Sequence, residues 1–137
     1  MKDDNNCRYL VRVLQAQKGR EFRDAAKRYA ALKKGRVYFV AQSQLKDQLG
    51  EPLQGDAPIG KDGDVWIVGE QSKGDFLVTA VHESKHLEGH GHDEALILSV
   101  YRAWIELSPA DHAQAVNSGR WVYLYTKGQA GIPPFNP

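Results

Sequence analysis

The sequence predicts an α+β fold, organised as one compact domain over residues 1–137. A chain of 137 residues can bury a sizeable core without disulfides or metals. Apolar residues make up 42% and charged residues 26% of the chain, which is ordinary for a globular protein. Long segments show helical spacing of apolar residues, and three short segments are rich in β-branched and aromatic residues. The predicted order is helices, two strands, three helices and one strand, which favours a small sheet packed on helices.

Residues 6–34 are predicted to be helical, because their apolar residues recur at helical spacing. Gly19 separates two apolar faces and predicts that this segment is divided into a pair of helices. Gly35 is the expected stop. The two faces consist of Cys7, Leu10, Val11 and Leu14, and of Phe22, Ala25, Ala26, Tyr29 and Ala30.

Two strands are predicted in the middle of the chain. Residues 36–41 read RVYFVA and residues 64–68 read DVWIV, and both segments are rich in β-branched and aromatic residues. Between them we expect a short helix over 43–49, ended by Gly50. The segment 51–63, rich in glycine and proline, is the longest loop signal of the chain.

The second half is predicted to contain three helices and one strand. Its helix starts carry capping residues, and its helix stops are glycines. The elements are a helix over 76–88 capped by Asp75 and followed by Gly89, an apolar helix from near Asp93 to Leu107, a helix from Ser108-Pro109 to Gly119, a strand over 121–126 and an irregular tail over 128–137.

Charge is unevenly distributed along the chain. Residues 1–36 carry eleven Lys/Arg and four Asp/Glu, a balance of +7, whereas residues 37–137 carry seven and thirteen, a balance of −6. Such asymmetry is found in proteins that bind nucleic acid or acidic partners. No aromatic residues interleave with the basic residues as a stacking platform would need, so a solvated basic helix is favoured over nucleic-acid binding.

The sequence favours neither secretion nor membrane insertion. Cys7 is the only cysteine, so no internal disulfide can form. No stretch is long and apolar enough to span a membrane, and the N-terminus lacks the apolar region of a signal peptide. We therefore expect folding in the cytoplasm, while the localisation stays unknown and export as part of a larger effector protein remains open.

Four of the five histidines fall within the eleven residues HESKHLEGHGH. His82 and His86 are four apart on the predicted helix, so their imidazoles lie on one face and can converge on one ion. Glu83 projects about 100° away around the helix, where it can reach a water on the ion without binding the ion itself. Gly89 can adopt a positive φ and turn the chain so that His92 approaches the same ion.

These residues form the pattern HExxHxxGxxH, and the chain resembles zincin-type zinc metallopeptidases with metzincin-like ligand spacing. The resemblance covers the active-site helix and its exit turn, and no Met-turn is found. It implies a compact zincin-like fold with a small sheet and a helix that carries HExxH. It also implies a Zn²⁺ ion held by His82, His86 and His92, with Glu83 as the catalytic base.

The implied reaction is endopeptidase cleavage of a peptide or protein substrate. Glu83 would take a proton from the zinc-bound water and pass it to the leaving amine. Zincin substrates extend along a sheet edge, and residues 64–68 are the expected edge. Trp66 is expected in the core, with a place in the substrate pocket as the alternative. An inhibitor or immunity protein is a further partner to expect if the domain is a toxin. Candidates for a second electrophile, among which the sequence does not choose, are Tyr101, Tyr123, Tyr125 and His112.

Several alternatives remain open at this point. Glu94 is the rival third ligand, since gluzincins take a glutamate from a second helix, but His92 is favoured. His90 is expected to be a solvated loop residue, and Asp93 either caps the next helix or hydrogen-bonds a ligating imidazole. The rival functions are a non-catalytic zinc-binding domain closed by a fourth ligand, a metal-dependent nuclease or toxin domain, and an interaction module with incidental histidines.

Overall fold

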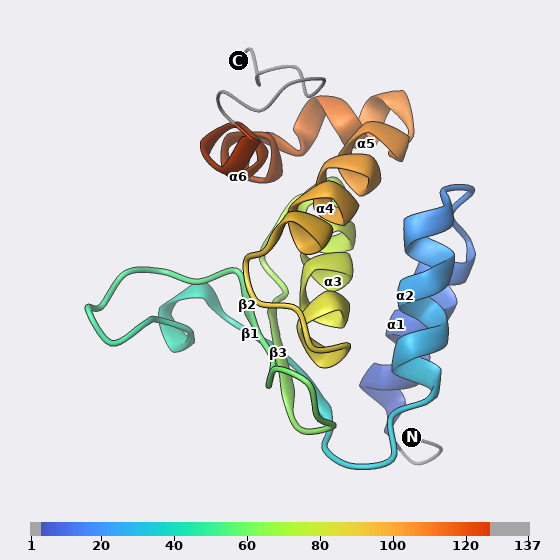
Figure 1. Cartoon of the computed structure of the whole chain (residues 1–137), viewed down its shortest axis with the longest axis vertical. Coiled ribbons are helices and arrows are strands. Elements are labelled where there is room, and N and C mark those ends of the chain that lie inside the picture. Colours follow the sequence, from blue (N-terminus) through green and yellow to red (C-terminus); the bar gives the residue numbers. More distant parts are fainter. Residues whose placement is uncertain (1–3, 127–137) are drawn as a thin grey trace.

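The computed structural model describes residues 4–126 and has an α+β architecture (Figure 1). Within that range the chain forms six α-helices, one short 3-10 helix and a three-stranded sheet. The α+β prediction is therefore confirmed, and the tail predicted at 128–137 lies outside the described residues. In chain order the elements are α1 (Asn5–Gln15), α2 (Arg20–Ala30), β1 (Val37–Val40), η1 (Gln42–Gln44), β2 (Gly55–Asp56), β3 (Val65–Val68), α3 (Lys73–Leu87), α4 (Glu94–Glu106), α5 (Pro109–Gln114) and α6 (Val116–Thr126).

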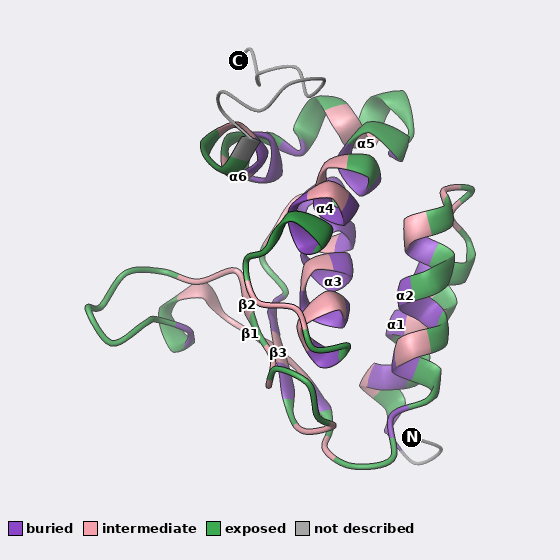
Figure 2. Ribbon diagram, in the orientation of Figure 1, coloured by how far each residue is buried: buried purple, intermediate pink, exposed green. Residues whose placement is uncertain are grey.

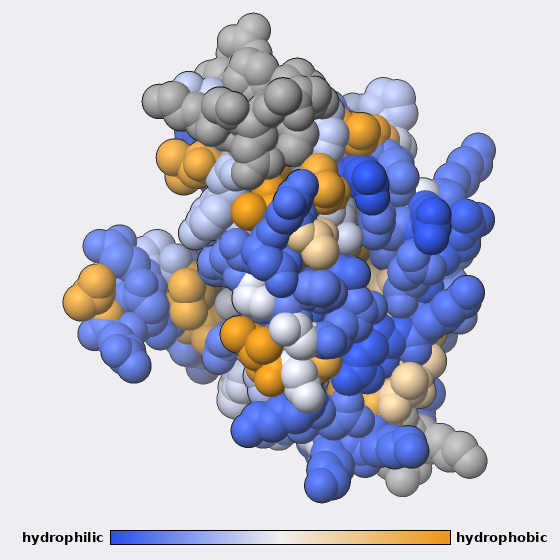
Figure 3. Space-filling view, viewed as in Figure 1, coloured by the Kyte–Doolittle hydropathy of each residue, from blue (hydrophilic) through white to orange (hydrophobic). Residues whose placement is uncertain are grey.

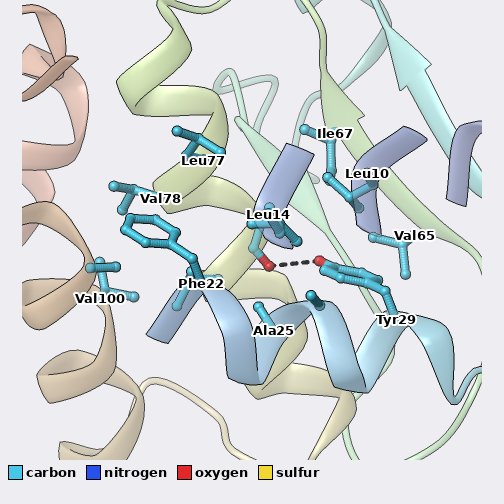
Figure 4. Close-up of a cluster of buried hydrophobic side chains, with 14 of the residues drawn as sticks. Leu10, Leu14, Phe22, Ala25, Tyr29, Val65, Ile67, Leu77, Val78 and Val100 are labelled. Atoms are coloured by element: carbon cyan, nitrogen blue, oxygen red, sulfur yellow. Dashed lines mark hydrogen bonds between the residues drawn. The ribbon is translucent and has the colours of Figure 1, made fainter. Parts of the chain in front are cut away.

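The N-terminal helices α1 and α2 pack together as a pair on one side of α3 (Figure 1). The predicted division at Gly19 is confirmed, because this residue is extended and forms the N-cap of α2. Tyr29 is fully buried, and its hydroxyl donates to the Ala80 carbonyl of α3 at 2.6 Å. Figure 4 shows this bond inside the core cluster, so α2 is tied to the helix that carries the histidines.

The sheet has the strand order β1-β3-β2, with β1 parallel and β2 antiparallel to β3. The two strands predicted at 36–41 and 64–68 are confirmed with shorter bounds. The prediction that 64–68 forms the sheet edge is wrong, because β3 is paired on both sides. Trp66 is neither core nor pocket: it is half-buried and stacks on Tyr38 at 4.3 Å between ring centroids, on the face of β3 opposite Val65 and Ile67.

The edge strand β2 lies in the segment predicted to be loop, and the helix predicted at 43–49 is absent apart from η1. The side chain of Asp47 explains why no longer helix forms here. Its carboxylate accepts the backbone N–H groups of Leu49 and Glu51 at 2.8 and 2.9 Å, and this local turn competes with helix formation. The segment instead folds back on itself through a bridge between Lys46 and Pro52.

Helix α3 is the central element, in contact with α2, α4, α5, α6, β2 and β3. Figure 2 shows its extensive burial. Its cap is Ser72, whose hydroxyl accepts the Asp75 N–H at 3.2 Å, so the prediction of Asp75 as cap is wrong. Asp93 caps α4, which is one of the two roles expected for it, since its carboxylate accepts the Leu96 N–H at 2.9 Å.

The strand predicted over 121–126 is wrong, because these residues belong to α6, and Gly119 lies inside that helix rather than at a stop. Ser108 and Pro109 open α5 as predicted, but the chain breaks at Ala115 with ψ of 56° and then restarts as α6. Buried Ser118, Gly119 and Val122 follow helical spacing, not the alternation of a strand. Packing therefore overrides the β propensity of WVYLYT.

Much of the surface over α1 and α2 is hydrophilic (Figure 3), in line with the exposed arginine and lysine residues of these helices. One of the basic residues, Arg28, pairs with Asp62 at 2.6 Å and fixes the end of α2 to the loop before β3. Within residues 4–126, no helix is long and apolar enough to cross a membrane.

Candidate metal centre

The exit of α3 is a tight turn built around Gly89. Its φ of 114° lies in a region that favours glycine, as predicted. The Gly89 N–H donates to the His86 carbonyl at 3.0 Å, and the His90 N–H donates to the Lys85 carbonyl at 3.1 Å. This pair of bonds is a Schellman motif, which ends the helix and reverses the chain.

Three imidazoles converge beside this turn. His82 and His86 come from successive turns of α3, and His92 comes from the segment between α3 and α4. Their ring centroids lie 4.9, 5.2 and 5.2 Å apart, close to an equilateral triangle. One ligand atom from each residue lies within 4.8 Å of the others. The three histidines expected from the sequence are therefore brought together.

The spacing within the cluster suits a tetrahedral ion. Nε2 of His82 and Nε2 of His92 are 3.2 Å apart. Two ligands on a tetrahedral zinc with bonds of 2.0–2.1 Å would be about 3.3–3.4 Å apart. These two nitrogens thus already have the separation that a shared zinc ion requires.

The turn also orients one of the rings. Nδ1 of His86 lies 2.7 Å from the His90 carbonyl oxygen, a distance at which Nδ1–H donates. With Nδ1 as the donor, Nε2 is the nitrogen through which the His86 ring can bind a cation. The sequence pattern does not predict this contact, because the acceptor is a backbone group created by the Gly89 turn.

Burial and neighbouring groups favour the neutral form of His82 and of His92. Burial, followed by the neighbouring His86 and His92, lowers the pKa of His82 to about 3. Burial, followed by His86, also lowers the pKa of His92. Metal binding needs neutral imidazole, so these shifts favour a cation over protons at neutral pH.

Glu83 is 4% exposed and lies on the side of α3 that faces β2. A β-carbon at Gly55 would be 2.8 Å from its Oε2, so glycine is what allows β2 to approach. Among the described residues, Oε1 of Glu83 has no hydrogen-bond partner. Burial, followed by the nearby Asp56, raises the pKa of Glu83 well above its usual range, and a cation at the imidazoles would act in the opposite direction.

A cavity of about 450 Å³ joins these groups. Its size is within the usual range for ligand sites. One wall is the segment around β2, the base is α3 with His82, Glu83 and His86, and the opposite wall includes His92 and α6. The buried carboxylate and the three imidazoles therefore open into one common space.

The alternative ligands that the sequence suggested lie outside the cluster. Glu94 is exposed on the first turn of α4 and is not part of the group of potential ligands. Nδ1 of His90 lies 2.9 Å from the Asp93 carboxylate. Asp93 therefore hydrogen-bonds an imidazole, but one that is not among the three candidate ligands.

None of the four candidate electrophiles lines the cavity. His112 donates from Nδ1 to the Trp104 carbonyl at 2.9 Å, within the α4–α5 corner. Tyr125 is the candidate nearest the cluster, with its ring 5.3 Å from that of His92.

Trp121 is a contact that the sequence prediction missed. Its ring lies 4.7 Å from His82 and 5.7 Å from His92, and it stacks on Tyr125 at 4.3 Å. Reading residues 121–126 as a strand hid this role. Had the segment been read as a helix, the spacing of Ser118, Trp121 and Tyr125 along one face would have indicated it.

Comparisons with protein-family models, with curated proteins and with solved structures found no match for this chain. The chemistry of the site must therefore be argued from its own residues.

Proposed function

We propose that the protein is a zinc-dependent endopeptidase with a compact zincin-like fold, in which His82, His86 and His92 hold the metal and Glu83 is the general base. The main support for the proposal is the convergence of three imidazoles next to a buried glutamate in one cavity. Three protein ligands leave one tetrahedral position open, which is typical of catalytic rather than structural zinc.

In the proposed reaction the imidazoles and Glu83 have different roles. His82, His86 and His92 would hold the zinc ion, which would supply a Lewis acid able to acidify water and polarise a carbonyl. Glu83 accepts the proton of the attacking water at Oε1, the oxygen without a partner among the described residues, and delivers it to the leaving amine. Oε2 faces Gly55, where an added β-carbon would lie 2.8 Å from it, so the backbone of β2 packs closely against the carboxylate.

The substrate would lie along β2. This two-residue strand is an edge of the sheet, and both of its residues line the cavity. An extended peptide can add to such an edge through main-chain hydrogen bonds. Gly55, next to the carboxylate, adds no side chain of its own between β2 and Glu83.

The test compares Glu83→Gln with wild type for bound zinc and for cleavage of an unfolded protein substrate. Both proteins should bind one zinc ion, and the variant should cleave about 10²–10⁴-fold more slowly because glutamine cannot take the proton. The matched control is Glu88→Gln, the same chemical change at an exposed residue paired with Lys85, which should cleave at the wild-type rate.

The rival functions give different results in the same experiment. Zinc bound at one per chain with no hydrolysis by wild type would point to a non-catalytic zinc domain. Salt-sensitive binding and degradation of nucleic acid would point to a nuclease. Absence of stoichiometric metal would point to an interaction module. Equal cleavage rates for Glu83→Gln and wild type would rule out the proposed mechanism.

A further inference from the structure

The ring of His92 has less support than the other two imidazoles of the cluster. His82 and His86 are half-buried on α3, and Nδ1 of His86 donates to the His90 carbonyl. His92 is exposed, and within residues 4–126 its ring has no hydrogen-bond contact except the one to Nε2 of His82. The turn at Gly89 places the backbone of His92, but the direction of the ring depends on other contacts.

Two aromatic rings of α6 supply these contacts. The Trp121 ring lies 5.7 Å from the His92 ring at an angle of 78°, and the Tyr125 ring lies 5.3 Å from it at 69°. Both arrangements are edge-to-face, which aromatic pairs favour. Trp121 and Tyr125 are four residues apart and stack on each other at 4.3 Å, so they form one aromatic surface beside His92.

Helix α6 is itself fixed to α3, so this surface starts from a held backbone. Buried Asp75 accepts both the N–H and the hydroxyl of Ser118, at 2.8 and 2.6 Å. Val122, the residue after Trp121, is fully buried in the core cluster. The Trp121 ring also lies 4.7 Å from that of His82. The contacts therefore run from the central helix through α6 to the exposed imidazole.

We infer that Trp121 and Tyr125 are positioning residues, which hold the His92 ring where it completes a three-histidine site for Zn²⁺. The inference rests on the metal ligands of the proposed function, but not on proteolysis. Without the two rings, the exposed His92 side chain would have more rotamers available, and ordering it on metal binding would cost more free energy. Removing the rings should therefore weaken zinc binding although all three ligands remain.

The first experiment measures zinc affinity by competition with a chromophoric chelator. Trp121→Ala should bind zinc about 10–100-fold more weakly than wild type, the range found for groups that orient a metal ligand. Trp121→Phe keeps a flat ring at this place and should restore most of the affinity. Trp66→Ala is the matched control, since Trp66 is also half-buried and stacked on a tyrosine but does not line the cavity. It should bind zinc as wild type does.

A double-mutant cycle shows whether the two rings act through His92. In a His92→Ala background, most of the effect of Trp121→Ala should disappear, because the imidazole that it positions is gone. A residue that only supports the fold would lower the affinity by the same factor in both backgrounds. Tyr125→Ala changes a residue that is 37% exposed, so it repeats the cycle even if Trp121→Ala unfolds the protein.

Co²⁺ in place of zinc reports on the geometry of the ligands. Wild type and Trp66→Ala should give the intense visible absorption of a four-coordinate ion, and Trp121→Ala should give a weaker spectrum close to that of His92→Ala. If Trp121→Ala binds zinc as tightly as wild type, or if its effect is the same with and without His92, the positioning role is wrong even when peptides are cut. If the cycle gives the expected result but no peptide is cut, the positioning role stands and the endopeptidase proposal fails.

Discussion

The three candidate ligands differ in how firmly the chain holds them. His82 and His86 are half-buried on a helix that packs on every side, and His86 is further fixed by the His90 carbonyl. His92 is exposed and depends on the turn after α3 for its position. The identity of the third ligand is therefore best tested by substituting His92.

His92→Ala should weaken zinc binding by about 100-fold or more, because losing a ligand costs more than the 10–100-fold lost with a group that only hydrogen-bonds to a ligand. Glu94→Ala should change zinc binding little, since Glu94 is exposed and lies outside the cluster. Competition with a chromophoric chelator measures both affinities. If the two results are reversed, the ligand set includes Glu94 instead of His92.

At the scale of single elements, the turn after α3 and the helix α6 complete the site. The Gly89 turn provides the carbonyl that orients His86 and returns the chain toward His92. Helix α6 provides the Trp121 wall, and one buried carboxylate anchors it. Each contribution can be removed by one substitution.

Gly89→Ala should lose zinc affinity as well as stability. An alanine at φ of 114° is strained by about 1–3 kcal/mol, and relief of that strain would shift the His90 carbonyl away from His86. Gly50→Ala is the matched control, because Gly50 also has a positive φ, 81°, and has no atom within 4 Å of an added β-carbon. Chemical denaturation should show a lower free energy of unfolding in both variants. Zinc titration should show reduced affinity only in Gly89→Ala. Equal zinc affinities would exclude the turn from the site.

Asp75→Ala should loosen α6. The Ser118 N–H and hydroxyl would lose their acceptor inside the protein, at a cost of about 1–3 kcal/mol for an unsatisfied buried group. Ser118→Ala removes only the hydroxyl bond and should cost about 1 kcal/mol. Denaturant midpoints and protease cleavage within α6 measure the two effects. An Asp75→Ala protein as stable as wild type would show that the anchor does not hold the helix.

The predictability of each element follows from the range of its interactions. His82, His86, Gly89 and His92 lie within eleven consecutive residues, so helical spacing and a glycine stop were enough to predict their convergence. The strand β2 depends on pairing with β3, and α6 depends on a bond to Asp75 forty-three residues away. Contacts between residues far apart in the sequence cannot be predicted from a local pattern. For residues 121–126 the local β propensity predicted a strand where the structure has a helix.

At the scale of the whole molecule, the candidate site is part of the fold's centre. α3 carries two of the histidines and also contributes Leu77, Val78 and Val81 to the hydrophobic core. His92 belongs to the connection that leads into α4, which packs against α3. An ion bound by all three histidines would therefore join the central helix to the next element, and its binding should stabilise the entire fold.

Zinc should raise the thermal midpoint of the wild-type protein in a concentration-dependent manner. A metal that binds only the folded state adds about 2.7 kcal/mol at a free concentration of 100 times the dissociation constant. For a chain of this size the corresponding shift is on the order of 10 °C. His82→Ala and His86→Ala should each abolish the shift, because both residues donate directly from α3. Mg²⁺, which prefers oxygen ligands, should produce no shift in wild type. A zinc-dependent shift that persists in His82→Ala would mean that the metal binds elsewhere. Hydrogen exchange measured with and without zinc gives a second test: if zinc slows exchange only around residues 89–93, the ion orders the turn without stabilising the core.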